Sequence, residues 1–146
     1  MKLAMGADHG GYSLKEILKK HLVEAGHEVL DLGTHDTSSC NYPDYAAKVA
    51  YAVADKDADL GILVCGTGIG MSIAANKVKG IRAAAVSDCF TAQATREHND
   101  SNIICLGERI VGPGLAMRIV DTWLETEFSG DERHQRRIDK MMALEN

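Results

Sequence analysis

A cysteine followed by three closely spaced glycines is the most chemically suggestive feature of the chain. Cys65 ends a short apolar run of strand length, and Gly66, Gly68 and Gly70 follow it at every second position before a helical pattern resumes at Met71. This order predicts a strand, a tight glycine loop and a helix whose first N–H groups attract negative charge and favour a thiolate. A lone cysteine is more often a buried core residue, but this position indicates a base beside N–H donors.

The glycine loop differs from two common phosphate-binding motifs. A dinucleotide-binding loop has the pattern Gly-x-Gly-x-x-Gly and an acidic residue about twenty positions later, and the stretch Gly66–Gly70 has neither. The absence of a following Gly-Lys-Ser/Thr excludes a P-loop. The earlier stretch Gly6–Gly11 also lacks the dinucleotide spacing. The sequence therefore favours a small phosphate or an oxyanion over NAD as the ligand.

Two histidine-containing pairs stand at the ends of predicted elements. Asp8 and His9 follow the first strand pattern, where they are either ordinary polar residues or ligand-binding residues. His98 and Asn99 end a helical pattern, where a histidine can equally complement the helix dipole. Because histidine changes its charge near neutral pH, both histidines are candidates for acid–base chemistry.

Three arginines are candidates for holding a phosphate. Arg133 and Arg137 are four residues apart on a predicted helix and so share one face, and Arg109 follows the last predicted strand. Such side chains are solvated by default, but a pair at this spacing can also bind a phosphate through bidentate hydrogen bonds. Arg136 points about 100° away from Arg137 and is better explained as a solvent-facing charge.

Composition and charge narrow the class of protein. The 146 residues are expected to form a single domain over 1–146, with 45% hydrophobic and 25% charged residues. A net charge of −5 argues against a nucleic-acid surface. The apolar segments are too short for a signal-peptide core or a membrane span. Four cysteines without C-x-x-C spacing and six histidines without metal-ligand spacing predict a reduced, cytoplasmic protein that binds no metal.

Five apolar runs alternate with helical patterns along the chain. Strands are predicted at Lys2–Ala7, Glu28–Leu32, Leu60–Val64, Ile81–Val86 and Ile103–Leu106. Helices are predicted at 13–25, 43–54, 71–75, 91–97, 113–124 and 131–144, the first beginning with a Ser13–Glu16 capping box and the last being a charged C-terminal extension.

This alternation predicts an α/β protein with a parallel sheet that is covered by helices on both faces. The common strand order for such a sheet is 2-1-3-4-5, and ligands bind beyond the carboxyl ends of the strands where the order reverses, here between the first and third strands. The loops 8–11 and 65–70 both follow those two strands. Sequence pattern and topology therefore predict one site.

Five motifs that span almost the whole chain carry a family resemblance. They are Gly6-Ala7-Asp8-His9-Gly10-Gly11, Cys65-Gly66-Thr67-Gly68-Ile69-Gly70, Ala74-Ala75-Asn76-Lys77, His98-Asn99 and Arg133-His134-Gln135-Arg136-Arg137. In this order they resemble the family of ribose-5-phosphate isomerase B and the galactose-6-phosphate isomerase subunits. The resemblance implies a Rossmann-like three-layer α/β/α sandwich and a homodimer with active sites at the subunit interface. It also implies that ribose 5-phosphate and ribulose 5-phosphate interconvert, a step of the pentose phosphate pathway, without a metal or organic cofactor.

The resemblance also implies a role for each candidate residue. Cys65 would move the proton between C2 and C1, while His98 of the neighbouring subunit and Asp8 would open the sugar ring. Met71 stands where another branch of the family has a glutamate base, so the chain looks like the cysteine branch. Thr67 and the N–H groups of Gly66, Gly68, Ile69 and Gly70 would hold the enediolate, His9, Arg109, Arg133 and Arg137 the phosphate, and Asn99 a sugar hydroxyl.

Three alternative functions stay open on sequence alone. The nearest is the same isomerisation of a six-carbon substrate, allose 6-phosphate or galactose 6-phosphate. Subunits of the galactose enzyme work as unlike pairs that each lack part of the site, whereas this chain keeps Cys65, His98 and the arginines together. A non-catalytic sensor of a phosphosugar or nucleotide is the second alternative, and a nicotinamide-dependent oxidoreductase is the third.

Overall fold

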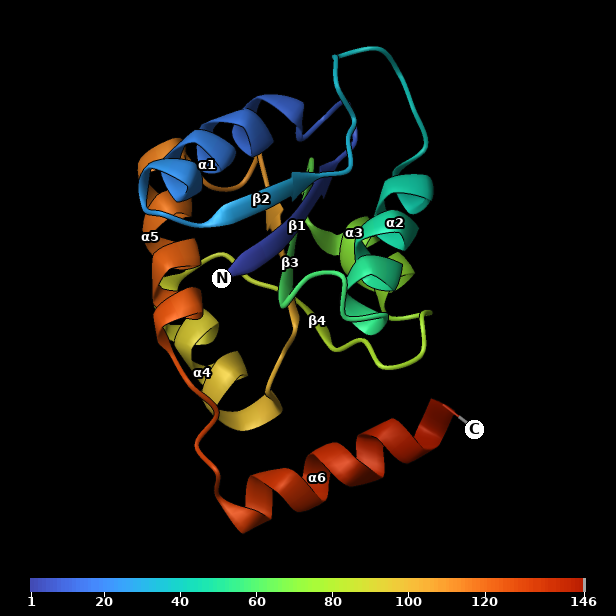
Figure 1. Ribbon diagram of the computed structural model, residues 1–146, viewed down its shortest axis with the longest axis vertical. Helices are drawn as coiled ribbons and strands as arrows, with labels where there is room; N and C mark the ends of the chain where they lie inside the picture. Colours follow the sequence, from blue (N-terminus) through green and yellow to red (C-terminus); the bar gives the residue numbers. More distant parts are fainter. Residues whose placement is uncertain (146) are drawn as a thin grey trace.

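The computed structural model describes residues 1–145, in which five strands form one parallel sheet between two layers of helices (Figure 1). The strands are β1 (Lys2–Ala7), β2 (Glu28–Asp31), β3 (Leu60–Cys65), β4 (Ala83–Ala85) and β5 (Ile103–Gly107). The helices are α1 (Tyr12–Glu24), α2 (Tyr42–Ala54), α3 (Ile69–Ala75), α4 (Cys89–Asn99), α5 (Pro113–Glu125) and α6 (Glu132–Met142), followed by the 3-10 turn η1 (Ala143–Glu145).

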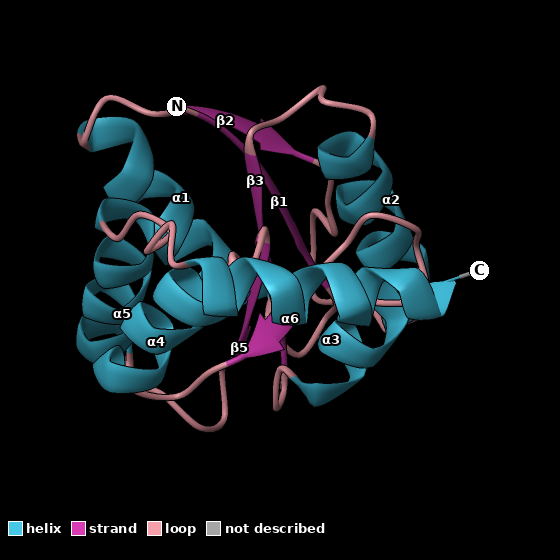
Figure 2. Cartoon of the chain, turned by 90° about the horizontal axis from the view of Figure 1, so that it is seen from below, coloured by secondary structure: helices cyan, strands magenta, loops and turns pink. Residues whose placement is uncertain are grey.

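Each face of the sheet has its own apolar core. On one face, alternate residues of β1, β3 and β5 pack with α1, α4 and α5, around the fully buried Trp123. On the other face, the intervening residues of the same strands pack with α2 and α3. Figure 2 shows the two helical layers on either side of the sheet. The predicted three-layer α/β/α sandwich and its all-parallel sheet are confirmed.

The predicted strand order is wrong in its last two positions. The sheet runs β2-β1-β3-β5-β4, so β5 pairs directly with β3 and β4 forms the edge. The burial of the two strands explains this order: every residue of β5 is buried, whereas the three residues of β4 are partly or fully exposed. A fully apolar strand gains more from a central position, and short edge strands are typical of natural sheets. The adjacency of β1 and β3, on which the predicted site depends, is confirmed.

The start of α1 also differs from the prediction. The N-cap is Gly11 rather than Ser13, and no side chain of a capping box bonds the first turn. Instead, Glu108 from the turn after β5 accepts a hydrogen bond from the N–H of Leu14 at 2.7 Å. A residue distant in sequence therefore satisfies an N–H group that is free at every helix start.

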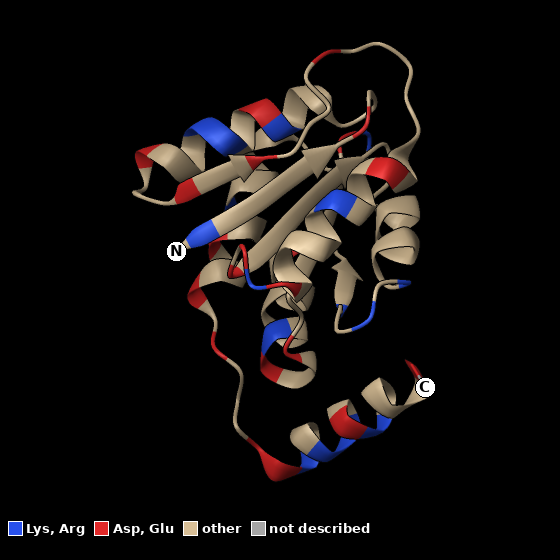
Figure 3. Cartoon of the chain, turned by 45° about the vertical axis from the view of Figure 1, so that its right-hand side comes forward, with Lys and Arg blue, Asp and Glu red and all other residues tan. Residues whose placement is uncertain are grey.

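The helix α6 is the predicted C-terminal extension, and it crosses the amino ends of the strands (Figures 1 and 2). Asp131 caps it by accepting the N–H of Arg133 at 2.7 Å, and this hydrogen bond lowers the pKa of Asp131. Basic and acidic side chains run along most of the helix (Figure 3). Ile138 is its only buried residue, so α6 is held by few apolar contacts. Within residues 1–145 no helix combines the length and the hydropathy that crossing a membrane requires.

A buried ion pair joins α1 to the end of β2. Lys15 is fully buried, and its Nζ lies 2.7 Å from both carboxylate oxygens of Asp31. Burial alone would raise the pKa of Asp31, but hydrogen bonds from Lys15, the Gly33 N–H and Lys19 together hold this pKa below its usual value. The Gly33 carbonyl in turn accepts the N–H of Ala7, at the end of β1, at 2.7 Å. The ion pair therefore fixes the segment that precedes Asp8.

Replacing Asp31 with asparagine tests this pair. Because the folded-state pKa lies below the unfolded value of about 4, ionised Asp31 stabilises the fold above that pH, and the contribution is lost as the pH falls through the folded-state pKa. Asp31→Asn leaves Lys15 buried without its anion, so the free energy of unfolding at pH 7 should fall by about 3 kcal/mol.

The measurement is urea unfolding from about pH 3 to pH 7, where the variant should show a smaller acid-induced loss of stability than the wild type. Asp57→Asn is the matched control, because Asp57 is exposed in the turn after α2. Equal losses in the two variants would contradict a role for the ionised Asp31.

Candidate active site

The loops after β1 and β3 meet at the carboxyl edge of the sheet. A methyl group on Gly10 would lie 3.5 Å from the backbone N of Gly66, and one on Gly11 would lie 2.3 Å from the carbonyl oxygen of Val64. Asp8 is almost completely buried at this junction, and its Oδ1 accepts the N–H groups of Gly10 at 2.9 Å and Gly11 at 3.1 Å. Gly11 therefore allows a backbone contact with β3 that no side chain could share, and Gly10 lies beside Gly66 at ordinary contact distance.

The sulfur of Cys65 faces the glycine loop. Cys65 is the last residue of β3, is 5% exposed, and its Sγ accepts the N–H of Gly68 at 3.1 Å. The N–H of Ile69 is donated to Thr67 Oγ1 at 3.2 Å. Cys65 is therefore neither isolated nor surrounded only by apolar groups, and the geometry suits a sulfur that exchanges a proton.

The turn after β5 completes this part of the site. The N–H groups of Glu108 and Arg109 are donated to the carbonyl oxygens of Cys65 at 2.9 Å and Gly66 at 3.1 Å. A methyl group on Gly66 would lie 3.6 Å from Cδ of Arg109, so the exposed arginine runs alongside the glycine loop. The structure thus brings Arg109 to the predicted anion site.

Two residues that the sequence analysis did not select border the same loops. Tyr42 lies against Gly70, where an added methyl group would come 2.8 Å from Cε1 of the tyrosine ring. Cys40 donates its backbone N–H to Nδ1 of His9 at 3.2 Å, and its Sγ lies 3.8 Å from the same nitrogen. The end of the 33–41 loop therefore forms a rim beside His9. The only sequence signal was the position of Tyr42 at the start of a helix, which does not reveal a contact with a distant glycine.

The thiols of Cys89 and Cys105 do not compete with Cys65. Cys105 is fully buried within β5, and this burial, followed by the proximity of Cys65, raises the pKa of its thiol. Cys89 begins α4 and is packed at the edge of the core. Of these thiols, it is Cys65 whose sulfur accepts an N–H group of the glycine loop.

The remaining predicted residues lie at the other end of the strands, where the amino ends of the strands are. His98 and Asn99 end α4, which runs back toward the amino ends of the strands, and both are exposed. The ring of His98 packs against that of His134 in α6, with centroids 4.5 Å apart and the two planes tilted by 41°. Arg133 and Arg137 are exposed on the same helix. The length of β5 separates this group from Cys65, about 16 Å at 3.3 Å per residue.

In one chain, the predicted site is therefore divided into two groups. The structure brings together Asp8, His9, the loop 65–70 and Arg109 at the carboxyl edge. It does not bring His98, Asn99, Arg133 or Arg137 to them. The role expected for His98 on a neighbouring subunit stays a prediction.

The fold is that of an α/β protein with a parallel sheet, and the candidate site lies where the strand order reverses. A family model described as Ribose/Galactose Isomerase matches residues 3–141, and the chain belongs to that family.

Named relatives and solved structures match nearly the whole chain. The chain is 50% identical to ribose-5-phosphate isomerase B of Escherichia coli (strain K12), covering 99% of this chain and 96% of the relative. It is 53% identical to a structure of ribose-5-phosphate isomerase B from Clostridium thermocellum, with a TM-score of 0.98 and coverage of 99% and 97%. A structure of the Mycoplasma genitalium enzyme with bound ribulose-5-phosphate is 44% identical, with a TM-score of 0.93 and coverage of 99% and 95%.

Replacing Gly11 with alanine tests the contact between the two loops. The added methyl group would overlap the carbonyl of Val64, so α1 must move away from β3 and carry the 8–11 loop with it. We expect a loss of about 1–3 kcal/mol in the free energy of unfolding, together with a loss of isomerase activity.

Gly114→Ala is the control, because Gly114 lies in α5 with nothing within 4 Å of an added methyl group. That substitution should stabilise the protein by about 0.5–1 kcal/mol and leave its activity unchanged. Wild-type activity and stability in Gly11→Ala would show that the loops tolerate separation.

Proposed function

We propose that this chain interconverts ribose 5-phosphate and ribulose 5-phosphate by ring opening and proton transfer through an enediolate. The observation that carries the proposal is the hydrogen bond from the Gly68 N–H to Cys65 Sγ, at the strand-order reversal of a chain that belongs to this isomerase family. The ribulose-5-phosphate bound to the Mycoplasma genitalium relative supports the choice of substrate.

Cys65 serves as the base in this mechanism. The thiolate removes the proton on C2 of the opened aldose, and the thiol then returns a proton to C1 while the hydroxyl proton of O2 passes to O1. The negative charge that develops on oxygen falls beside Thr67 and the N–H groups of Gly66, Gly68, Ile69 and Gly70, of which those of Gly68 and Ile69 are also donated to Cys65 Sγ and Thr67 Oγ1 within the loop. Donors that are already oriented toward a developing oxyanion lower the barrier, by about 3 kcal/mol for one donor.

Ring opening needs an acid and a base on the two sides of the sugar. Both hydrogen bonds of the Asp8 carboxylate use Oδ1 within residues 1–145, so Oδ2 is the oxygen assigned to the sugar. His9 Nδ1 accepts the Cys40 N–H, which leaves Nε2 to donate a proton or a hydrogen bond to the phosphate. Arg109 holds the same phosphate from the side of Gly66. The partner subunit's His98 supplies the second acid–base group, and the partner subunit's Asn99 bonds a sugar hydroxyl.

The divided site requires a homodimer in which α4 and α6 of each chain contribute residues to the active site of the other chain. Arg133 and Arg137 of α6 then complete the phosphate site of the other chain. Several large apolar side chains are exposed in the single chain and suit a subunit interface. They include Ile69 and Ile73 on one face of α3, Phe90 at the start of α4, and Ile110 after β5, all more than half exposed.

A dinucleotide fits the structure less well than a sugar phosphate does. Glu108 already accepts the N–H of Leu14, so its carboxylate would repel a pyrophosphate at the start of α1, where dinucleotides bind related sheets. A six-carbon sugar phosphate remains the nearest alternative substrate, because the family description covers both ribose and galactose isomerases. We place the protein in the cytoplasm, an assignment that its four free cysteines support.

Cys65→Ala tests the proposed base. Removing a general base should lower kcat for ribose 5-phosphate by about 10²–10⁴-fold while KM changes little, because the phosphate contacts remain. Cys89→Ala is the control and should keep wild-type kinetics.

The same assay with allose 6-phosphate and galactose 6-phosphate separates the substrates. A higher kcat/KM for either six-carbon sugar would replace the proposed substrate. Unchanged turnover in Cys65→Ala would reject the sulfur as the base, and binding without turnover in the wild type would indicate a sensor.

Subunit mixing tests the shared site. Neither Cys65→Ala nor His98→Asn should be active alone, but a mixed dimer places the Cys65 of one chain opposite the His98 of the other. Random exchange of equal amounts should restore about a quarter of wild-type activity, because half of the dimers are mixed and each has one intact site. If both residues act within one chain, mixing restores nothing.

A further inference from the structure

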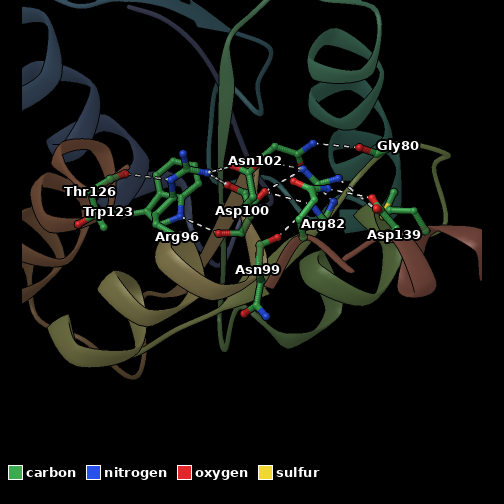
Figure 4. A network of polar contacts seen from close by, with 12 residues as sticks. Gly80, Arg82, Arg96, Asn99, Asp100, Asn102, Trp123, Thr126 and Asp139 are labelled. Carbon is green, nitrogen blue, oxygen red and sulfur yellow. Dashed lines mark hydrogen bonds and ion pairs between the residues drawn. The ribbon is translucent and has the colours of Figure 1, made fainter. Parts of the chain in front are cut away.

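An arginine that directly precedes β4 binds the C-terminal end of α4. The last carbonyls of a helix have no partner within the helix. Arg82 Nε donates to the carbonyl oxygens of Asn99 at 3.1 Å and Asp100 at 3.0 Å, and its Nη2 donates to that of Asp100 at 2.9 Å (Figure 4). The guanidinium therefore binds the carbonyl of Asn99 itself and of the residue that follows it.

Asp100 needs this support because of its backbone. It ends α4 in the left-handed conformation, with a φ of +45°, which most L residues avoid. Its carboxylate accepts Arg96 Nη1 at 2.9 Å and lies 3.7 Å from Arg82 Nη2. Two arginines thus hold both the carbonyl and the side chain of the residue at which the chain reverses.

Arg82 is itself fixed in place. Its backbone N–H is donated to Asn102 Oδ1 at 2.8 Å, and the Asn102 amide is donated to the Gly80 carbonyl at 2.9 Å. The side chain is only 18% exposed, and its two hydrogen bonds to the Asp100 carbonyl are partly buried. Figure 4 shows Arg82 at the centre of this network, with the side chain of Asn99 turned away from it. The network therefore holds the backbone of Asn99 and leaves its side chain available.

Arg82 also contacts α6, the second helix whose residues are proposed to act in the partner's site. Its Nη1 lies 3.7 Å from Sδ of Met142 at the end of α6. A cavity of about 510 Å³ separates α6 and η1 from the β4 edge, and Arg82, Asn99 and Met142 line it. Because α6 has few apolar contacts beneath it, a polar contact at this cavity constrains its position more than it would in a filled core.

We propose that Arg82 is a positioning residue that orients the half of the active site lent to the partner subunit. The inference rests on the proposed function, because it needs His98 and Asn99 to act on the neighbouring chain. Loss of the guanidinium leaves the Asn99 and Asp100 carbonyls without these donors, so the end of α4 frays and His98 moves. Small displacements of a catalytic group cost up to about a hundredfold in rate.

The experiment places Arg82→Gln in either chain of a mixed dimer. In one arrangement the substitution joins Cys65→Ala, so it lies in the chain that lends the working His98. In the other it joins His98→Asn, so it lies in the chain that carries the working Cys65. We expect kcat to fall at least about tenfold in the first arrangement and to equal that of the unmodified mixed dimer in the second.

Equal activity loss in both arrangements would overturn the proposal, because a general loss of stability does not depend on which chain carries it. Equal activity without loss would overturn it as well. Failure of the proposed function is seen separately, since the Cys65→Ala and His98→Asn mixture without Arg82→Gln would then show no recovery.

Two further variants guard against misfolding. Arg82→Lys keeps the charge but cannot bind two carbonyls and Met142 together, so it should recover only part of the lost rate. Arg118→Gln removes the same charge from an exposed position on α5 and should leave the mixed dimer unchanged. A fully active Arg82→Lys or a fully active Arg82→Gln, each with a wild-type thermal midpoint, would contradict positioning by the guanidinium.

Discussion

The hydrogen bond between the Gly68 N–H and Cys65 Sγ depends on a backbone path that glycine adopts without strain. Gly68 has a φ of +80° and passes so close to β5 that a methyl group there would lie 3.0 Å from the carbonyl carbon of Leu106. Gly107 makes the matching approach from β5, where a methyl group would lie 2.7 Å from Cα of Thr67. The loop is thus seated on the sheet by backbone contacts, and its donors are oriented before any ligand arrives. Such orientation is what makes N–H groups effective toward a developing negative charge.

The two halves of the site are stabilised in different ways. The Cys65 half is built into the sheet, between two fully buried apolar cores. The His98 half stands on the end of α4 and on α6, where polar contacts rather than burial hold the backbone. Exposing this half to water in the single chain costs less free energy than exposing an apolar surface would, because its residues are charged or polar. It is also easier to displace, which is why the hydrogen bonds around Asp100 matter for the proposed shared site.

Much of the architecture follows from local patterns. The strand, glycine loop and helix at 60–75 combine a short apolar run, a glycine repeat and a helical period, and all three signals agree. The start of α1 shows the limit of such patterns. Ser13 and Glu16 have capping-box spacing, yet the helix begins earlier, because Gly11 alone can lie against Val64 and because Glu108 supplies the missing acceptor. Contacts between residues that are nearly a hundred positions apart leave no periodic signal, and the same holds for Tyr42 beside Gly70.

The strand order has the largest consequence for the site. Because β5 pairs with β3, Gly107 lies directly beside Cys65, and the turn that follows it delivers Arg109 to Gly66. In the order 2-1-3-4-5, β4 would separate them and move that turn one strand further away, by about 4.8 Å. The edge position instead falls to β4, whose Ala83 is bonded at both its N–H and its carbonyl by the side chain of Asn76. At Ala83 the side-chain amide takes the place of a neighbouring strand, while the adjacent Arg82 reaches across to the end of α4.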